Sequence, residues 1–160
     1  SNIVFKEKDL LNLNEKVKYD LVYSIDVLEH IPGNKKVIEN IFGALKKGGI
    51  FYLAMPWDEA NSRLLPAFFF KDSDAWADKE HIGEQYSLNE LTDLMKKIGF
   101  KILEARYTFG IWGKLAWEME KVFTFLGPTG SIFKPFLKML GHLDIYKRNK
   151  EGALLVIAKR

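Results

Sequence analysis

Cysteine is absent from this sequence of 160 residues, which excludes disulfide frameworks, a thiolate nucleophile and zinc sites built from cysteine. No apolar run approaches the roughly 20 residues that span a bilayer, and no signal-peptide pattern opens the chain. Neither sign of charge dominates, because 24 basic residues stand against 21 acidic ones without the clusters of Lys and Arg that nucleic-acid surfaces show. We therefore expect a cytoplasmic protein that does not bind nucleic acid.

Apolar residues are plentiful, at 48% of the chain with 14% aromatic, which is enough for one packed domain and argues against disorder. Their periodicity predicts strands over residues 3–5, 19–25, 50–55, 100–107 and 152–159, and helices over 35–47, 88–98, 111–126 and 131–143. Residues 57–86 are expected to be irregular. The alternation of strands and helices indicates the α/β class, with a mostly parallel sheet covered by helices.

Two helix boundaries are marked by local signals. Ser87 and Glu90 form the capping-box pattern that opens a helix, and Gly99 is expected to close it. The apolar residues between positions 35 and 47 fall on one face of an earlier helix, which the glycine pair at 48–49 is expected to end.

Three sequence motifs go further than periodicity. They read YDLVYSIDVLEHIP at residues 19–32, ALKKGGIF at 44–51, and YSLNEL through KIGF at 86–100. Together they resemble the fourth-strand, fifth-strand and pre-sixth-strand signatures of the class I S-adenosylmethionine-dependent methyltransferases. The Leu-Glu-His-Ile stretch is most similar to the subgroup that includes the ubiquinone-biosynthesis O-methyltransferases. The resemblance covers roughly residues 19–107 and implies an enzyme that uses S-adenosylmethionine.

The resemblance also implies an α/β, Rossmann-like sheet with the strand order 3-2-1-4-5-7-6, of which this chain is expected to hold strands 3 to 7. No Gly-x-Gly occurs, although the family usually has a glycine-rich loop that approaches the methionine part of the cofactor. We therefore expect residues 1–160 to be the C-terminal part of one methyltransferase domain, with a helical insert at about 108–146. Such a chain is expected to be inactive alone.

The absence of strands 1 and 2 has a structural consequence for the sheet. It leaves the fourth strand with a bare edge, and a bare apolar edge tends to pair with another strand. This predicts a homodimer through the exposed edge, a displaced third strand, or a further N-terminal segment.

Five cofactor-binding residues follow from the resemblance. Asp9 and Leu10 come after the third strand, where the family's acid accepts a hydrogen bond from the adenine amine and the next backbone amide meets a ring nitrogen. Ser24, Ile25 and Asp26 lie at the carboxyl end of the fourth strand, which lines the ligand crevice in open α/β sheets. The resemblance implies that Ser24 and Ile25 contact the methionine part of the cofactor. A solvated loop carboxylate and an ordinary strand end are the alternatives.

The sharpest cluster of chemical groups is Asp26-x-x-Glu29-His30. The ubiquinone-biosynthesis O-methyltransferases use a similar Glu-x-x-Glu-His for a divalent cation, but Asp26 has a shorter reach and no metal is expected here. His30 is a candidate general base, because imidazole titrates near neutral pH. His81 is a second catalytic candidate, since the family often has a histidine there. The alternatives are a loop-building role for His30 and a surface position for His81, and His142 is expected to be structural.

The acceptor is less well defined, because methyl transfer needs little from the protein beyond alignment and proton removal. We expect a small-molecule acceptor, with a hydroxyl nucleophile slightly favoured and an apolar acceptor such as a lipid or quinone as one option. The aromatic residues within 57–76 and 112–136 form either a lid over it or part of the core. Lysines on the insert helices permit a peripheral membrane contact. A non-catalytic, methyltransferase-like assembly module is the alternative function.

Overall fold

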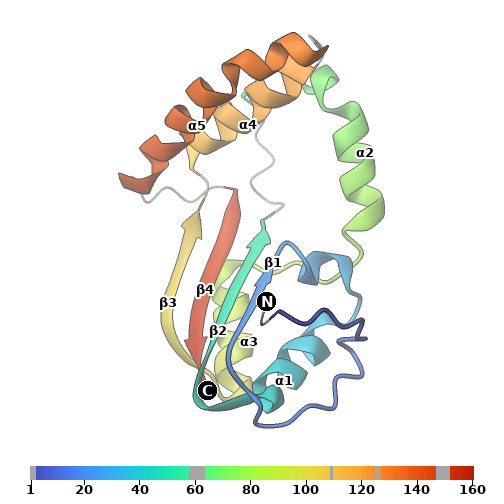
Figure 1. Ribbon diagram of the computed structural model, residues 1–160, viewed down its shortest axis with the longest axis vertical. Coiled ribbons are helices and arrows are strands. Elements are labelled where there is room, and N and C mark those ends of the chain that lie inside the picture. Colours follow the sequence, from blue (N-terminus) through green and yellow to red (C-terminus); the bar gives the residue numbers. More distant parts are fainter. Residues whose placement is uncertain (1–2, 58–63, 109, 125–126, 147–151) are drawn as a thin grey trace.

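The computed structural model describes residues 3–57, 64–108, 110–124, 127–146 and 152–160. Their centre is a four-stranded sheet in the order β1-β2-β4-β3, built from β1 (Tyr19–Ile25), β2 (Leu45–Pro56), β4 (Ala153–Lys159) and β3 (Lys101–Thr108) (Figure 1). β1 runs parallel to β2, whereas β4 is antiparallel to both of its neighbours. The sheet is therefore mixed, and the prediction of a mostly parallel sheet is wrong for these strands.

The position of β4 at the centre of the sheet follows from its composition. Its residues 154–158 are all apolar, and four of the five are buried. A continuous apolar run is typical of a strand in the interior of a sheet, and β4 lies between β2 and β3. The resulting order corresponds to the 4-5-7-6 end of the sheet that the resemblance implies.

Two helices cover one face of this sheet, α1 (Asn34–Ala44) and α3 (Leu88–Ile98) (Figure 1). The predicted start of α3 is confirmed, because the Ser87 hydroxyl accepts from the Glu90 amide at 3.3 Å and the Glu90 carboxylate accepts from the Ser87 amide at 2.8 Å. Gly99 ends the helix in the left-handed conformation, with a φ of 120°.

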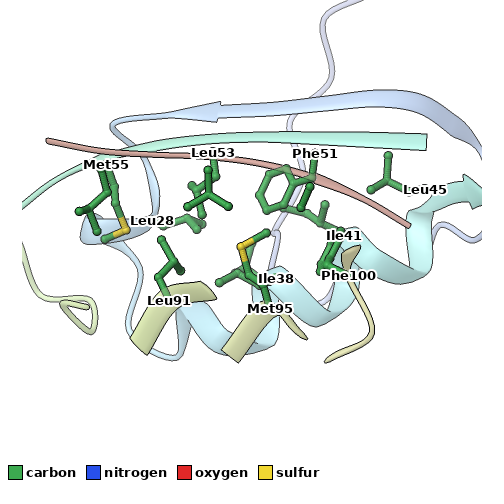
Figure 2. Close-up of a cluster of buried hydrophobic side chains, with 14 residues drawn as sticks. Leu28, Ile38, Ile41, Leu45, Phe51, Leu53, Met55, Leu91, Met95 and Phe100 are labelled. Carbon is green, nitrogen blue, oxygen red and sulfur yellow. The ribbon is translucent and has the colours of Figure 1, made fainter. Parts of the chain in front are cut away.

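The hydrophobic core lies between these helices and the sheet (Figure 2). Alternate residues of β2 point to the same face of the sheet, so every second one reaches the helices. The buried side chains that meet there include Phe51, Leu53 and Met55 from β2, Ile38 and Ile41 from α1, and Leu91 and Met95 from α3.

The opposite face of β1 is uncovered in the part of the chain that the structure describes. Leu21, Tyr23 and Ile25 alternate onto that face and are 58%, 71% and 51% exposed. Among the described strands β1 pairs with β2 alone, so its outer edge is open. The structure thus has the bare edge that the sequence predicts.

The first predicted strand is wrong. Residues 3–5 have no regular secondary structure, and Ile3, Val4 and Phe5 are largely exposed. A run of three apolar residues forms a strand only where a neighbour accepts its hydrogen bonds, and no described strand lies beside it. The chain turns back onto α1 further on, where the side-chain nitrogen of Asn40 donates to the carbonyls of Leu10 and Leu11 at 2.9 and 2.8 Å.

The boundary between α1 and β2 also differs from the prediction. The helix ends at Ala44, and the lysine pair at 46–47 belongs to β2. The end of the chain causes this, because the Gly48 amide donates to the Arg160 carbonyl and the Arg160 amide donates to the Gly49 carbonyl, each at 2.9 Å. The Arg160 guanidinium also donates to the Gly43 carbonyl, 117 residues away, at 3.0 Å. Local periodicity carries no sign of such distant partners.

The region predicted to be irregular contains a helix, α2 (Lys71–Glu80), preceded by the short 3-10 helix η3 (Ala67–Phe69). Residues 58–63 of that region lie outside the described residues. Trp76 is the sole large apolar residue of α2 and is itself exposed. Because the helix lacks an apolar face, the hydrophobic period that identifies helices is missing from its sequence.

The expected insert helices are present as α4 (Ile111–Thr124) and α5 (Lys134–His142), joined by η4 (Gly127–Phe133) and followed by η5 (Leu143–Tyr146). They lie beyond one end of the sheet (Figure 1). Phe123 stacks on Phe133 with centroids 4.5 Å apart, and Phe70 stacks on Trp117 at 6.0 Å, so several of these aromatic residues pack against one another. Positions 125–126, with Phe125, lie outside the described residues. None of the helices within the described ranges is long and apolar enough to cross a membrane.

Candidate functional site

A pocket of about 420 Å³ runs along β1. The loop before β1 contributes Leu10, the strand itself contributes Ser24 and Ile25, and α1 contributes Ile41 from the other side. Its volume falls in the range of small-molecule sites, roughly 300–1,000 Å³, and its lining is mainly apolar. Three of the five predicted cofactor-binding residues therefore lie together around one cavity.

Ser24 is the residue of this lining whose buried polar side chain lacks a hydrogen-bond partner among the described residues. The residue is 8% exposed, and its hydroxyl oxygen is buried with no hydrogen-bond partner within the described residues. A buried hydroxyl without a partner is destabilising, by about 1–3 kcal/mol. A ligand with a polar group at this end of β1 would remove that cost, so the residues around the pocket fit a bound molecule with polar atoms.

Asp9 and Asp26 do not line this pocket, although they were predicted with the other three. The Asp9 carboxylate is exposed and accepts from the Leu11 amide at 2.9 Å and from the Asn12 side chain at 2.6 Å, so it shapes its own loop. Asp26 is exposed at the end of β1, with a φ of 52° in the left-handed region, which aspartate adopts more readily than most residues other than glycine. Its amide donates to the Ala54 carbonyl at 3.1 Å, which continues the ladder to β2.

The 3-10 helix η1 (Leu28–His30) follows directly and carries the next two candidate residues. The His30 Nδ1 lies 2.9 Å from the Glu80 carbonyl, which can only accept, so Nδ1 bears the hydrogen and Nε2 bears the lone pair of the neutral ring. Nε2 lies 3.9 Å from a carboxylate oxygen of Glu29. The two residues therefore form a carboxylate–imidazole pair whose basic nitrogen faces the carboxylate.

Glu29 is buried to 1% exposure, and its second carboxylate oxygen has no hydrogen-bond partner in the described chain. Burial raises the pKa of this carboxyl group above its ordinary value of 4.5, and the negative charge of Asp26 acts in the same direction. The backbone amide of Glu29 and the nearby His30 and His81 act in the opposite direction and lower the pKa. Burial has the largest effect, so the pKa of Glu29 is raised overall.

His81 reaches the same place from the end of α2. Its ring lies 5.1 Å from that of His30, and Trp76 packs edge-on against both rings at 6.1 Å. One ligand atom from each of Glu29, His30 and His81 lies within 4.8 Å of the other two. The structure thus brings the two predicted catalytic histidines together with Glu29, while Asp26 is not part of this group.

Residues 80–86, at the end of α2 and after it, are hydrogen-bonded to η1 and to the start of α1, and we call these contacts the clasp. The Gly83 amide donates to the Glu29 carbonyl at 2.8 Å, and a Cβ at position 83 would lie 2.5 Å from the Leu28 carbonyl oxygen. The Asn34 side chain donates to the Leu28 carbonyl at 3.0 Å and to the Glu84 carbonyl at 2.9 Å. Sequence reasoning missed Gly83, Glu84 and Asn34, because a glycine and two polar residues some 50 positions apart carry no shared pattern.

Glu84 completes the clasp as a helix cap. Its carboxylate accepts from the Gly33 and Asn34 amides at 3.0–3.1 Å, at the start of α1. Its own backbone amide, together with those of Asn34 and Gly33, lowers the pKa of Glu84. Tyr86 adds a hydrogen bond from its hydroxyl to the Asn34 side-chain oxygen at 2.8 Å. The loop that carries Glu29 and His30 is therefore fixed by the segment after α2 and by the start of α1.

Solved structures share this fold. They include an S-adenosylmethionine-dependent methyltransferase from Mesorhizobium loti, 16% identical over 100% of this chain and 70% of that one, with a TM-score of 0.60. Phosphoethanolamine N-methyltransferase 2 from Haemonchus contortus, in complex with S-adenosyl-L-methionine, is 21% identical over 95% of this chain and 36% of that one, at 0.58. The 4+2 cyclase SpnF is 15% identical over 98% and 56%, at 0.58. These identities show the fold alone, and the chain spans only part of each relative.

The family itself is shown by the sequence. Residues 2–105, more than half of the chain, match a family described as Methyltransferase domain. No curated protein matches the chain. With the strand order and the pocket along β1, this match establishes that the chain belongs to the class I S-adenosylmethionine-dependent methyltransferase domain family.

Proposed function

We propose that this chain forms the acceptor side and one wall of the cofactor site of a methyltransferase that acts on a hydroxyl group of a small, apolar molecule. The observation that carries the proposal is the pocket along β1, whose lining includes Val27, the residue that directly precedes η1 with His30. A ligand held by β1 would lie close to the residues that can take up a proton. The fold does not decide the reaction, since a cyclase shares it.

The cofactor side of the proposal rests on Leu10, Ser24 and Ile25, the predicted cofactor-binding residues that line the pocket. S-adenosylmethionine, when bound, supplies a methyl group on a sulfonium sulfur that needs no further activation. The work left to the protein is to align the acceptor oxygen with that methyl group and to keep water away. The apolar lining and the unpartnered Ser24 hydroxyl support binding at this wall.

Methylation of a hydroxyl group also requires a proton acceptor, and His30 has the right tautomer for this. Its Nδ1–H donates to the Glu80 carbonyl, which leaves the Nε2 lone pair available for the proton. The neighbouring Glu29 carboxylate would stabilise the imidazolium that results. His81 and the exposed Trp76 lie beside His30, and Trp76 gives an apolar acceptor a surface to rest on. An oxygen nucleophile therefore suits these residues.

Calorimetry with S-adenosylhomocysteine tests the cofactor part of the proposal. We expect weak binding by the 160-residue chain, because it has no Gly-x-Gly loop, and tighter binding by the longest form of the protein that its gene encodes. Ser24→Ala should weaken binding, whereas Ser131→Ala, on η4, should leave it unchanged. Absence of binding by the longest form would rule out the methyltransferase proposal.

The second candidate function is a non-catalytic assembly module, and the exposed face and edge of β1 favour it. Leu21, Tyr23 and Ile25 together present an apolar surface next to unpaired backbone groups, which is the surface that strand pairing uses. In this alternative two copies of the chain pair through β1. The cofactor test separates the two candidates, since an assembly module has no need for S-adenosylhomocysteine.

A further inference from the structure

Glu29, His30 and His81 present a set of ligand atoms that is familiar from zinc enzymes. We propose that these three residues bind a divalent transition metal ion of the zinc type. One ligand atom from each residue lies within 4.8 Å of the other two. Two imidazoles and one carboxylate suit Zn²⁺, with the fourth position left to water. Ligand atoms in a tetrahedral zinc site lie about 3.3 Å apart, so a closure of at most about 1.5 Å completes the geometry.

The orientation of His30 is the one that metal ligation requires. Its Nδ1–H is fixed by the Glu80 carbonyl at 2.9 Å, and its Nε2 faces Glu29 at 3.9 Å. Histidines that bind metals usually donate their other ring nitrogen to a carbonyl or a carboxylate, which fixes the tautomer and raises the basicity of the ligating nitrogen. The end of α2, where Glu80 is the last helical residue and His81 the cap, thus supplies both the supporting carbonyl and the third ligand.

Glu29 gives an independent reason to place a cation here. The residue is 1% exposed, and one of its carboxylate oxygens has no hydrogen-bond partner among the described residues. A buried carboxylate is stable only when it is paired with a cation, protonated or saturated with hydrogen bonds. His30 Nε2, 3.9 Å away, is too far for a hydrogen bond. A metal ion between the three side chains would satisfy the carboxylate.

This site differs from the one considered in the sequence. There the candidate cation ligands were Asp26, Glu29 and His30, and no metal was expected. In the structure Asp26 is exposed and outside the group, and its place is taken by His81, which is 51 residues from His30 in sequence. The clasp formed by Gly83 against Glu29 keeps His81 at this position.

The chain offers a direct test because it contains three histidines. Long-range ¹H–¹⁵N spectra of the unsubstituted protein, titrated with ZnCl₂, report each imidazole separately. We expect the ligating nitrogens of His30 and His81 to shift together and to saturate at one equivalent of zinc. His142, which is exposed on α5 and bonded to the Lys138 carbonyl, is the internal control and should not shift. Zinc that shifts His142 alone, or no histidine at all, would overturn the proposal.

Affinity measurements on variants identify the ligands. Competition with a chromogenic chelator gives the zinc dissociation constant of the wild type, Glu29→Gln, His81→Ala and His142→Ala. Loss of a ligand should weaken binding at least tenfold, since even the supporting partners of metal ligands contribute about 10–100-fold. Equal affinity of the wild type and His81→Ala would contradict the site. Circular dichroism checks each fold, and the spectra of the unsubstituted protein decide the question if a variant unfolds.

Metal binding at this site goes beyond the proposed function and does not depend on it. A zinc ion on His30 Nε2 uses the lone pair that a general base needs, so the loaded chain should not take a proton at His30. Zinc is therefore expected to inhibit an acceptor reaction that uses this base, and a chelator should restore it. The histidine spectra and chelator competition require neither S-adenosylmethionine nor an acceptor. Failure of the metal site and failure of the methyltransferase proposal are consequently separate results.

Discussion

The carboxyl group of Glu29 shows how one residue determines the chemistry of its surroundings. A glutamate at 1% exposure, with one oxygen unpartnered within the described chain, is destabilising in its charged form. It lies in the loop that carries His30 and next to the ring of that histidine. Buried charges with incomplete pairing are more common at functional sites than elsewhere, because stability alone favours their replacement.

Replacement of Glu29 by glutamine should stabilise the metal-free protein in a pH-dependent way. Burial raises the pKa of the Glu29 carboxyl group above 4.5, so the stability that its protonated form contributes is present below that pH. This contribution is lost as the pH rises through the raised pKa of the folded state. Glu29→Gln should therefore be nearly neutral at pH 4 and more stable than the wild type at pH 7, by about 1 kcal/mol.

The measurement is urea unfolding of both proteins at several pH values in the presence of a chelator. Other titrating groups are common to the two proteins and cancel in the difference. A difference that is independent of pH would show that the Glu29 carboxylate is not desolvated in solution.

At the scale of elements, the group formed by Glu29, His30 and His81 depends on the contact between residues 80–86 and η1. His30 is hydrogen-bonded to the last turn of α2, and Gly83 is hydrogen-bonded to Glu29. Asn34, at the start of α1, is hydrogen-bonded both to η1 and to the segment after α2. Leu28 of η1 also packs in the hydrophobic core with Val37 and Ile38 of α1. The polar contacts of the clasp therefore add to apolar packing in fixing the position of this loop.

Gly83→Ala should break this clasp. The added Cβ would lie 2.5 Å from the Leu28 carbonyl oxygen and 2.8 Å from that of Ile31, so the backbone must move. We expect a loss of about 1–3 kcal/mol in the free energy of unfolding, as for other overpacked sites. Separation of the His30 and His81 rings should follow, visible as changed imidazole resonances.

Gly43→Ala is the matched control. A Cβ at position 43 meets nothing within 4 Å, and the residue lies inside α1. Alanine there should stabilise the protein by roughly 0.5–1 kcal/mol, because it favours the helix. Equal effects of the two substitutions would mean that segment 80–86 does not pack against η1.

The elements that could be predicted from the sequence are those with a local cause. α3 has its capping box and its apolar period, and β4 has its apolar run. The start of β2 could not be predicted, because Leu45 pairs with Tyr19, and Gly48 and Gly49 are hydrogen-bonded to Arg160, all of them distant in the sequence. α2 has too few apolar residues for a periodic signal. Local patterns therefore identify elements that bury a face, and they fail where distant backbone pairing decides.

At the scale of the whole molecule, the same limit applies to the site. Leu10, Ser24 and Ile25 were predicted through the resemblance and do line one pocket. His30 and His81 are each predicted from the sequence, but their contact, with ring centroids 5.1 Å apart, could not be inferred from it, since that contact depends on the path of α2. Family motifs point to candidate residues, whereas the contacts between motifs come from tertiary structure.

The mixed sheet presents β1 at its rim, with one face and one edge open in the described part of the chain. If two copies pair through this edge, light scattering at tens of micromolar should give twice the chain mass of 18.5 kDa. Charged side chains on an edge strand oppose pairing, so the double substitution Leu21→Lys with Tyr23→Lys should return the protein to a monomer.

Met139→Lys is the control for added charge, because this residue is similarly exposed but lies on α5, away from β1. It should leave the mass at that of the dimer. A monomer at every concentration would exclude assembly through β1. The uncovered residues Leu21, Tyr23 and Ile25 would then have to be stable in contact with water, and their substitution by lysine should leave the free energy of unfolding within about 0.5 kcal/mol of the wild type, as for other surface changes. A larger loss in a monomer would instead show that β1 needs these side chains to hold its place beside β2.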